Sequence, residues 1–446
     1  MEKDRVTAGL RRDLGTIESY ATLIGVLIGA GIFKVTSDAW ALTGPSVILG
    51  YFVLAPAVLA TSVAYSVFIS TPLGREPGGE YAHISRTFGG HGLAFVGVWL
   101  KIISYIGALA YLSRAFADYL LGGHRPALVM PIAVAILLFF YVVHVIGVRW
   151  FGRVQVWMCV LLGVSLIALI VPGLFAIHPA NYRPFVTHGF RGFAASLPPL
   201  FFAYAGFESL AQTAGEVRDS TRRLPRVFLL GITATTIIYL LMSVVAFGVL
   251  PGKELAASAA PMTAVASRYL PAGTEILITI GALMAITTSL NGTMLVPSRV
   301  AIVLVEDGLA PRWLGWIWPR TATPVIGLTI TTVAALILLL SGEIGLALNI
   351  AVFALVVLYF LHSFALLLLP RMNRELFQSV TVRIPLSLQR IAAVISMVAM
   401  GGIIVLASAS TIKLALAWSA VGALMYFIAN RRTARRVKDA EKAKLA

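Results

Sequence analysis

The sequence predicts an all-α integral membrane protein with about twelve transmembrane helices. Of its 446 residues, 59% are hydrophobic and only 12% are charged, whereas soluble domains carry about 25% charged residues. Long apolar runs recur along the whole chain, and each helix that crosses a bilayer needs roughly 20 apolar residues. We therefore expect a bundle of helices in lipid, with no room for a sizeable soluble domain.

Polar breaks divide the apolar sequence into separate predicted spans. They are 17–42, 45–70, 91–121, 126–147, 153–177, 192–215, 226–250, 273–304, 323–341, 344–369, 386–408 and 411–430. Residues 1–16 are predicted to form an N-terminal tail without the pattern of a cleaved signal peptide. Residues 431–446 form a basic C-terminal tail.

The basic residues predict the orientation of these spans, because cytoplasmic loops carry an excess of Lys and Arg. Placing both termini in the cytoplasm puts 26 of the 35 Lys and Arg residues on the inner side, 6 in outer loops and 3 within spans. The net charge of +16 thus follows membrane topology, and no basic face alternates with aromatic residues. We expect a multi-pass protein of the plasma membrane without a nucleic-acid partner.

Several functional classes are disfavoured. The sequence has no Ser/His/Asp set, metal motif or phosphate loop inside its spans, so we expect no enzyme. Its single cysteine, Cys159, provides neither a disulfide nor a cysteine metal site. A channel would need a continuous polar pathway, which these spans lack. A transporter is the best interpretation, and a non-transporting membrane sensor is the alternative from another class.

Two spans contain helix-breaking glycines near their middles. The first reads GVLIGAGIF from Gly25 to Phe33, and the sixth reads FFAYAGFES from Phe201 to Ser209. Interrupted helices at matching positions in two halves of a chain are the best sequence sign of a transporter site between inverted repeats. The alternative is that the glycines only let helices pack closely. The matched pair favours a binding site.

Four stretches in order along the chain resemble the amino acid–polyamine–organocation superfamily, and specifically its amino acid permeases with the LeuT-type fold. They are Ile28–Phe33, Pro77–Tyr81, Ala205–Glu208 with Glu216 and Leu224–Arg226, and Ser298–Arg299 with Glu306–Leu309. The resemblance covers roughly residues 15–370. One minor departure is Ser220, which stands where the family often has proline.

The resemblance implies a transporter core at 17–369, made of two five-helix inverted repeats at about 17–177 and 192–369. Two peripheral helices at 386–430 follow. The substrate binds between discontinuous helices 1 and 6, where freed N–H groups take a carboxylate and freed carbonyls take an ammonium group. The expected substrate-binding residues are Ile28, Gly29, Ala30, Gly31, Phe202, Ala203, Tyr204, Gly206, Ser104 and Thr287.

Side chains near these breaks predict the class of substrate. Some relatives specific for cationic amino acids carry a glutamate where this chain has Ser104, so we expect a neutral amino acid that is small or apolar. Phe202 is interpreted as a lid over the substrate, with a core aromatic as the alternative. Glu208 and Lys101 are intramembrane charges to which we assign coupling or gating roles. A structural carboxylate is the alternative for Glu208. Lys101 is expected to pair with a buried carboxylate such as Glu208 or to extend toward the interface.

The driving force remains open between sodium, protons and exchange. The stretch Ala285–Ser289 resembles the sodium-site pattern of the fold, so Na⁺ is the favoured coupling ion and no other cofactor is expected. The expected ligands are Gly25, Ile28, Ala285, Thr288 and Ser289. The alternative is that the two hydroxyls only bond a neighbouring helix. The span-5 lysine of some proton-coupled relatives falls near Leu162 and is missing. The protein is expected to be a monomer or homodimer.

Overall fold

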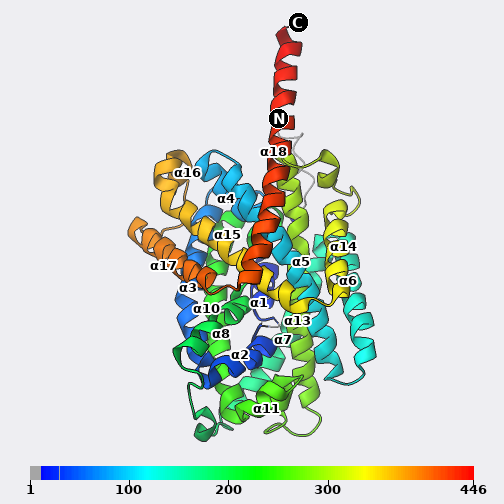
Figure 1. Cartoon of the computed structure of the whole chain (residues 1–446), viewed down its shortest axis with the longest axis vertical. Coiled ribbons are helices and arrows are strands. Elements are labelled where there is room, and N and C mark those ends of the chain that lie inside the picture. The colour runs from blue at the N-terminus through cyan, green and yellow to red at the C-terminus, as the bar shows by residue number, and fades with distance from the viewer. Residues whose placement is uncertain (1–11, 30, 446) are drawn as a thin grey trace.

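The computed structural model describes residues 12–29 and 31–445, which form a bundle of helices (Figure 1). Within these residues there is no β-strand, only two isolated backbone bridges. The prediction of an all-α protein is confirmed for the described part of the chain. Ten of its helical segments are long and apolar enough to cross a membrane.

The long helices run side by side. Their bounds are α1 Thr16–Leu27, α3 Val47–Ile69, α5 Gly92–Leu121, α6 Val129–Ile146, α7 Val148–Gly173, α10 Ser220–Val249, α13 Glu275–Glu306, α14 Val325–Ser341, α15 Ile344–Met372, α17 Leu386–Val405 and α18 Ala409–Leu445. Shorter helices are α2 Thr36–Thr43, α4 Gly79–Phe88, α8 Gly189–Tyr204, α9 Ser209–Gln212, α11 Gly252–Ala257, α12 Pro261–Ala266 and α16 Arg374–Gln378.

Two of the twelve predicted spans are not among these ten. The predicted span 192–215 is interrupted, because α8 ends at Tyr204 and α9 begins only at Ser209. The predicted span 323–341 corresponds to α14, an apolar helix of 17 residues that is slightly shorter than the ten membrane-spanning candidates. The total of twelve spans and the relation between two inverted repeats therefore stay predictions.

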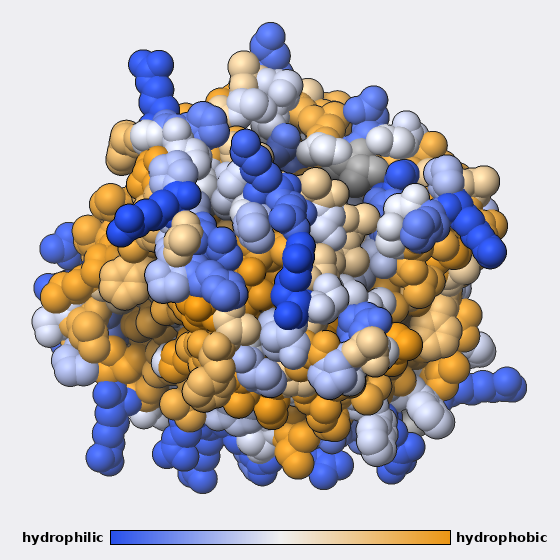
Figure 2. Space-filling model, turned by 90° about the horizontal axis from the view of Figure 1, so that it is seen from below, coloured by the Kyte–Doolittle hydropathy of each residue, from blue (hydrophilic) through white to orange (hydrophobic). Residues whose placement is uncertain are grey.

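The outer surface of the bundle is apolar. Large hydrophobic side chains are exposed on its outward faces, among them Trp157 on α7 and Val398 on α17. Figure 2, which views the molecule from the α11 end, shows apolar side chains in orange around much of the outline. Such a surface would be costly in water but suits the hydrocarbon core of a bilayer.

Helix α13 forms much of the centre and packs against α1, α5, α7 and α14. Small residues let these backbones approach closely, as is common between membrane helices. At the contact between α7 and α13, a Cβ placed on Gly281 would lie 2.1 Å from the Cβ of Ser165. The contact therefore has no space for a side chain at position 281.

We predict that Gly281→Ala lowers the unfolding midpoint of the purified protein, because α7 and α13 must separate to admit the methyl group. Overpacking of this kind costs about 1–3 kcal/mol. Gly163→Ala on the same helix pair is the control, since a Cβ at Gly163 meets no atom within 4 Å. Thermal unfolding in detergent measures both. Equal midpoints for the two variants would contradict the close packing.

Candidate functional site

The first helix is interrupted between Leu27 and Gly31. After α1 ends, Ile28 leaves the helical conformation with φ −79° and ψ +69°, and the Gly29 N–H bonds the Leu27 carbonyl at 2.8 Å. The chain becomes helical again in a π-helical turn, Gly31–Val35, that leads into α2. Ala30, one of the expected substrate residues, lies outside the described residues.

The glycines of this break are required by close contacts with other helices. A Cβ on Gly29 would lie 2.0 Å from the Ser289 hydroxyl oxygen, and a Cβ on Gly31 would lie 2.4 Å from the Cα of Ala203. Any side chain at either position would push the break away from α13 or α8. The sequence signal and the geometry agree that glycine is needed here.

The second interruption follows Tyr204 at the end of α8. Ala205 is extended and Gly206 has φ +105°, a left-handed conformation that favours glycine. A Cβ at Gly206 would also lie 2.5 Å from a methyl carbon of Val26 on α1. The two interruptions therefore lie against each other, although about 175 residues separate them in the sequence.

Carbonyl groups freed at the end of α1 are bonded by side chains of other helices. The Ser289 hydroxyl donates to the Val26 carbonyl at 2.7 Å, and Thr288 Oγ1 lies 2.7 Å from the Gly25 carbonyl oxygen. The Tyr239 hydroxyl of α10 lies against the Leu27 carbonyl and 2.6 Å from the Ala203 carbonyl. Tyr239 thus joins the two broken helices. Tyr239 was not among the residues predicted from the sequence, because nothing in its apolar surroundings distinguishes it.

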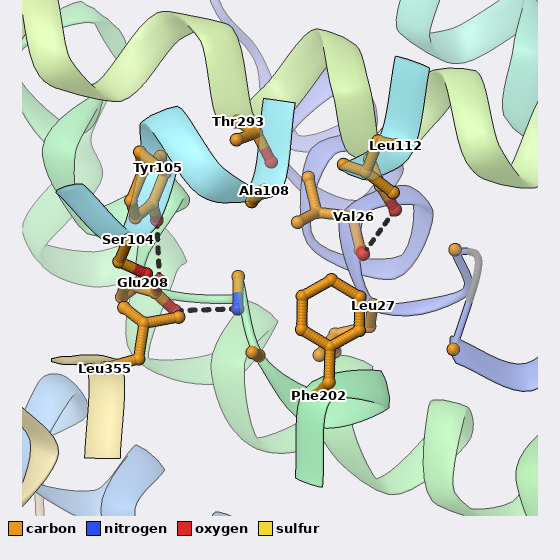
Figure 3. Close-up of a pocket in the computed structure, with 15 residues that line it drawn as sticks. Val26, Leu27, Ser104, Tyr105, Ala108, Leu112, Phe202, Glu208, Thr293 and Leu355 are labelled. Atoms are coloured by element: carbon orange, nitrogen blue, oxygen red, sulfur yellow. Dashed lines mark hydrogen bonds between the residues drawn. The ribbon is translucent and has the colours of Figure 1, made fainter. Parts of the chain in front are cut away.

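A cavity lies between the two interruptions and α5, α13 and α15 (Figure 3). Its lining residues are Val26, Leu27, Gly29, Gly31, Ser104, Tyr105, Ala108, Leu112, Phe202, Ala205, Gly206, Glu208, Ser289, Thr293 and Leu355. Phe202 points from the end of α8 toward Val26 and Leu27 (Figure 3). The walls are mainly apolar, and the polar side chains come from α5, α13 and the second interruption, which carries Glu208.

The expected substrate residues divide into two groups in this geometry. Gly29, Gly31, Ser104, Phe202 and Gly206 line the cavity. The remaining four described residues are buried but do not line it: Ile28, Ala203, Tyr204 and Thr287. The Tyr204 ring packs edge-on against the Tyr51 and Tyr239 rings, and the Thr287 hydroxyl bonds the Leu283 carbonyl of its own helix at 2.8 Å.

Several lining residues were not among the expected ones. Ser104, Ala108 and Leu112 are spaced four apart on α5 and form one helical face. This periodicity could have identified Ala108 and Leu112 once Ser104 was chosen. Thr293 is likewise four residues after Ser289 on α13. Leu355 on α15 carries no comparable signal among so many apolar residues.

Glu208 is a buried carboxylate at the edge of the cavity. It accepts hydrogen bonds from the Tyr105 hydroxyl at 2.6 Å, the Gly206 N–H at 2.9 Å and the Tyr359 hydroxyl. All three partners are donors, so they suit an ionised carboxylate, which only accepts. One carboxylate thus binds the second interruption to α5 and α15.

Lys101 pairs with Glu80, not with Glu208. The Lys101 ammonium lies 2.7 Å from a Glu80 carboxylate oxygen, and both side chains are at most 1% exposed. Glu80 also accepts from Gln212 at 2.6 Å and from the Tyr65 hydroxyl. The position of Glu80 could not be anticipated, because it begins a short helix between two spans. Lys101 is not a lining residue of the cavity.

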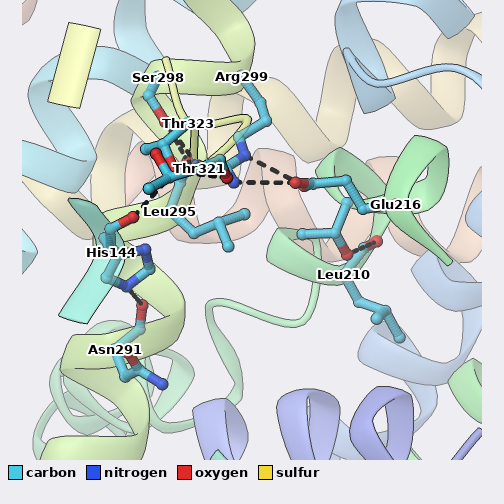
Figure 4. A network of polar contacts seen from close by, with 10 residues as sticks. His144, Leu210, Glu216, Asn291, Leu295, Ser298, Arg299, Thr321 and Thr323 are labelled. Carbon is cyan, nitrogen blue, oxygen red and sulfur yellow. Dashed lines mark hydrogen bonds and ion pairs between the residues drawn. The ribbon is translucent and has the colours of Figure 1, made fainter. Parts of the chain in front are cut away.

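A second buried ion pair lies farther along α13 (Figure 4). Arg299 donates two hydrogen bonds to Glu216, at 3.0 and 3.2 Å, with both side chains at most 2% exposed. Arg299 is ten residues beyond Ser289, about 15 Å along the helix. The segment after Glu216 pairs with the start of the chain through backbone bonds between Leu14 and residues 216 and 218. These contacts close this end of the bundle.

The short helix α4 is bound to the same end. The Tyr81 hydroxyl donates to Asp307 at 2.8 Å, and Arg86 contacts the other Asp307 oxygen at 3.2 Å. Burial, followed by the neighbouring Asp307 charge, raises the pKa of Tyr81 well above its usual value. Tyr81 therefore stays protonated and remains a donor at physiological pH.

Two buried histidines and one further ion pair of the long helices contact other protein groups. His144 is buried, with its ring nitrogen 2.9 Å from the Asn291 carbonyl, and His362 lies 2.9 Å from the His83 ring nitrogen. Arg114 and Asp118, four residues apart on α5, form a partly exposed ion pair at 3.1 Å. No group of three metal-binding side chains occurs among the described residues.

The expected cation ligands lie close together. Thr288 Oγ1 is 2.7 Å from the Gly25 carbonyl oxygen and 2.8 Å from that of Ala285, and Ser289 Oγ is 3.4 Å from the Gly25 oxygen. The α7 side chains nearest to Gly25 are those of Gln155 and Cys159. Neutral oxygens predominate here, which suits a hard monovalent cation. The same contacts also satisfy the alternative in which the hydroxyls only bond α1.

Residues 14–388 match the family described as amino acid permease. The chain belongs to that family. It is 27% identical to the branched-chain amino acid permease BcaP of Bacillus subtilis, over 71% of this chain and 72% of that protein. It is 26% identical to the methylthioribose transporter of the same organism, over 95% and 94%. It is also 26% identical to the vacuolar cationic amino acid transporter 4 of Arabidopsis thaliana, over 71% and 56%.

Membership confirms the resemblance seen in the sequence, and the family is one of membrane transporters. The matched region contains both helix interruptions, the cavity and the two buried ion pairs. The last long helix, α18, lies outside it.

We predict that Lys101→Met or Glu80→Gln alone destabilises the permease by about 3–5 kcal/mol, because each leaves a buried charge without its partner. The double variant Lys101→Met/Glu80→Gln should recover most of that loss. Thermal unfolding of the four proteins gives the coupling energy. Strictly additive losses would show that the two side chains do not stabilise each other.

Proposed function

We propose that this protein is a secondary active transporter of small or apolar neutral L-amino acids that works by alternating access. The observation that carries the proposal is the contact between two interrupted helices beside a cavity lined by Gly29, Gly31, Phe202 and Gly206. Inside a membrane, non-helical backbone is tolerated only where it is buried in protein or lines a polar cavity. Backbone groups that face such a cavity lack helical partners, and a bound solute would supply them.

The lining favours a zwitterion with an apolar side chain. Freed backbone N–H groups near Gly31 attract a carboxylate, whereas the Gly29 N–H already donates to the Leu27 carbonyl. The described residues of the lining include no cationic side chain for that task. The Glu208 carboxylate and freed carbonyls near the second interruption suit an ammonium group. Leu112, Leu355 and Phe202 are positioned for an apolar side chain. The name of the branched-chain relative supports the same class.

Alternating access needs closures that can open. We assign one to the Arg299–Glu216 pair together with the Leu14–Val217 backbone contact, which connect α13, the segment after the second interruption and the start of α1. By the positive-inside rule, this end of the bundle and both termini face the cytoplasm. We propose the plasma membrane as the membrane in which the protein lies. A core of two inverted repeats followed by peripheral helices α17 and α18, acting as a monomer or homodimer, completes the proposal.

We favour Na⁺ as the coupling ion, bound by the oxygens of Gly25, Ile28, Ala285, Thr288 and Ser289. Support comes from the short distances among four of these groups and from the neutral Gln155 beside them, which brings no competing positive charge. Proton coupling and exchange are the alternatives, and the uptake experiment separates all three.

In proteoliposomes, we expect an inward Na⁺ gradient to drive uptake of labelled leucine, valine or alanine. Thr288→Ala and Ser289→Ala should each reduce sodium-dependent uptake at least tenfold, while Thr329→Ala, a hydroxyl on α14 away from the cavity, should not. Uptake driven equally by a proton gradient without sodium, or only by amino acid loaded inside, would replace the sodium proposal with one of the alternatives. A lack of amino acid binding and movement would favour the sensor.

The relative that matches the chain almost end to end provides a second candidate substrate, methylthioribose. This thioether sugar lacks both charged ends of an amino acid, so competition separates the two. We expect excess leucine to block labelled leucine uptake, and excess methylthioribose or arginine to leave it unchanged. Inhibition by methylthioribose alone, with uptake of the labelled sugar, would reassign the substrate.

We predict that Gly29→Val abolishes substrate binding without unfolding the protein, because its side chain would occupy the position of the Ser289 hydroxyl. Gly345→Val is the control, since a Cβ there meets no atom within 4 Å. Equilibrium binding of labelled substrate and size-exclusion elution measure the two properties. Normal affinity in a folded Gly29→Val protein would contradict a site at this interruption.

A further inference from the structure

A second cavity, which shares no lining residue with the first, is formed where three segments meet at the Arg299–Glu216 end of the bundle. It is partly open to the surface, measures about 630 Å³ and is lined by eight residues: Arg75, Thr221, Arg222, Pro225, Arg226, Thr381, Val382 and Arg383. Four of the eight are arginines, and none is acidic. We propose that this cavity binds the headgroup phosphate of an anionic phospholipid in the adjoining leaflet.

The walls of the cavity are fixed to one another by hydrogen bonds. The Ser220 hydroxyl, at the start of α10, donates to the Gly74 carbonyl of the 3₁₀ turn Pro72–Arg75. Thr381, in the connection before α17, donates its hydroxyl to the Ser70 carbonyl at 2.8 Å. These bonds bring Arg75, the arginines of α10 and Arg383 to one place.

The nearest acidic side chains on α10 and its approach have other partners. Asp219 is 3.0 Å from Arg223, and Glu216 binds Arg299. The four lining arginines are all exposed and form no ion pair with a described residue. Arginine is the side chain best suited to phosphate, because its planar group offers several donors in a fixed geometry. The cavity therefore concentrates positive charge that has no counterpart within its walls.

The surface next to the cavity decides between a lipid and a soluble phosphate. On α10, Arg222 and Arg226 are followed on the same helical face by Leu230 and Ile237, which are 60% and 53% exposed. From Arg226 to Ile237 this face runs about 16 Å, roughly half the thickness of the hydrocarbon core. The basic end of α10 thus continues directly into a lipid-facing apolar face.

Helix α17 repeats this arrangement. It begins just after Arg383, and its exposed residues Leu388, Ile391, Ile395 and Val398 follow one face. A phospholipid with its phosphate among the arginines would lay its acyl chains along these two apolar faces. A free phosphate ion would make no use of them. Basic pockets between transmembrane helices at the cytoplasmic side bind anionic headgroups in this way.

Native mass spectrometry of the full-length protein with phosphatidylglycerol or phosphatidylcholine of identical acyl chains tests the proposal. We expect preferential retention of one phosphatidylglycerol. Arg226→Gln/Arg383→Gln should weaken that binding roughly 30-fold, at about 1 kcal/mol for each arginine. The control is Arg371→Gln/Arg374→Gln, which removes two exposed arginines near the same connection that do not line the cavity.

Size-exclusion elution checks that each variant is folded. Equal retention of the two lipids, or equal loss in test and control variants, would overturn the proposal. A competing titration with inorganic phosphate covers the soluble source. Displacement of phosphatidylglycerol by phosphate at micromolar concentration would show a soluble-anion site and would also overturn it.

Discussion

The structure depends on how the carbonyl groups at the end of α1 are paired within a membrane. A helix that ends in lipid leaves carbonyls without partners, and each unpaired group costs several kcal/mol. Here side-chain hydroxyls of two other helices donate hydrogen bonds to these carbonyls. Thr288 and Ser289 of α13 bond the carbonyls of Gly25 and Val26, and Tyr239 of α10 bonds that of Leu27. These bonds fix α10 and α13 around the interruption. The helices at the centre of the bundle are therefore arranged by the need to pair that backbone.

The same pairing explains why the cavity lies where it does. The carbonyl side of the α1 interruption is occupied by protein hydroxyls, so it is the N–H side, toward Gly31, that is left for a solute. At the second interruption, Glu208 accepts a hydrogen bond from the Gly206 N–H, and the Tyr239 hydroxyl donates one to the Ala203 carbonyl. Protein side chains thus satisfy the inner part of each interruption, and the part facing the cavity is left open to the substrate.

The buried charged side chains differ in whether their partners are charged, and this difference distinguishes the two ion pairs from Glu208. Lys101 and Glu80 neutralise each other outside the cavity, as do Arg299 and Glu216. Glu208 has only hydroxyl and amide donors and lies in the lining. Among the described residues no cationic group forms an ion pair with Glu208, so an ammonium group entering the cavity would be the first to do so. Of these carboxylates, Glu208 is the one whose surroundings a substrate can change.

Much of this arrangement could be predicted from the sequence, and the failures have physical reasons. Both interruptions were predicted because glycine in mid-membrane is a strong local signal. The partner of Lys101 was missed because Glu80 lies in a short helix entered through left-handed Gly78 and Gly79, a turn of the chain that hydropathy does not register. Thr287 was expected in the site, yet Ser289 and Thr293 line it. Composition identifies a hydroxyl-rich helix but does not specify its rotation.

The overlap between the expected cation ligands and the groups that pair α1 gives coupling a physical form. Thr288 Oγ1 and the Gly25 carbonyl now lie at hydrogen-bonding distance. A cation placed among these oxygens would take over their lone pairs and turn the hydroxyl proton elsewhere, so α1 would have to adjust at Gly25. The backbone N–H groups proposed to bind the substrate begin only six residues later, at Gly31, and the intervening Gly29 lies beside Ser289. An ion at this position would therefore act on the backbone of the proposed substrate site.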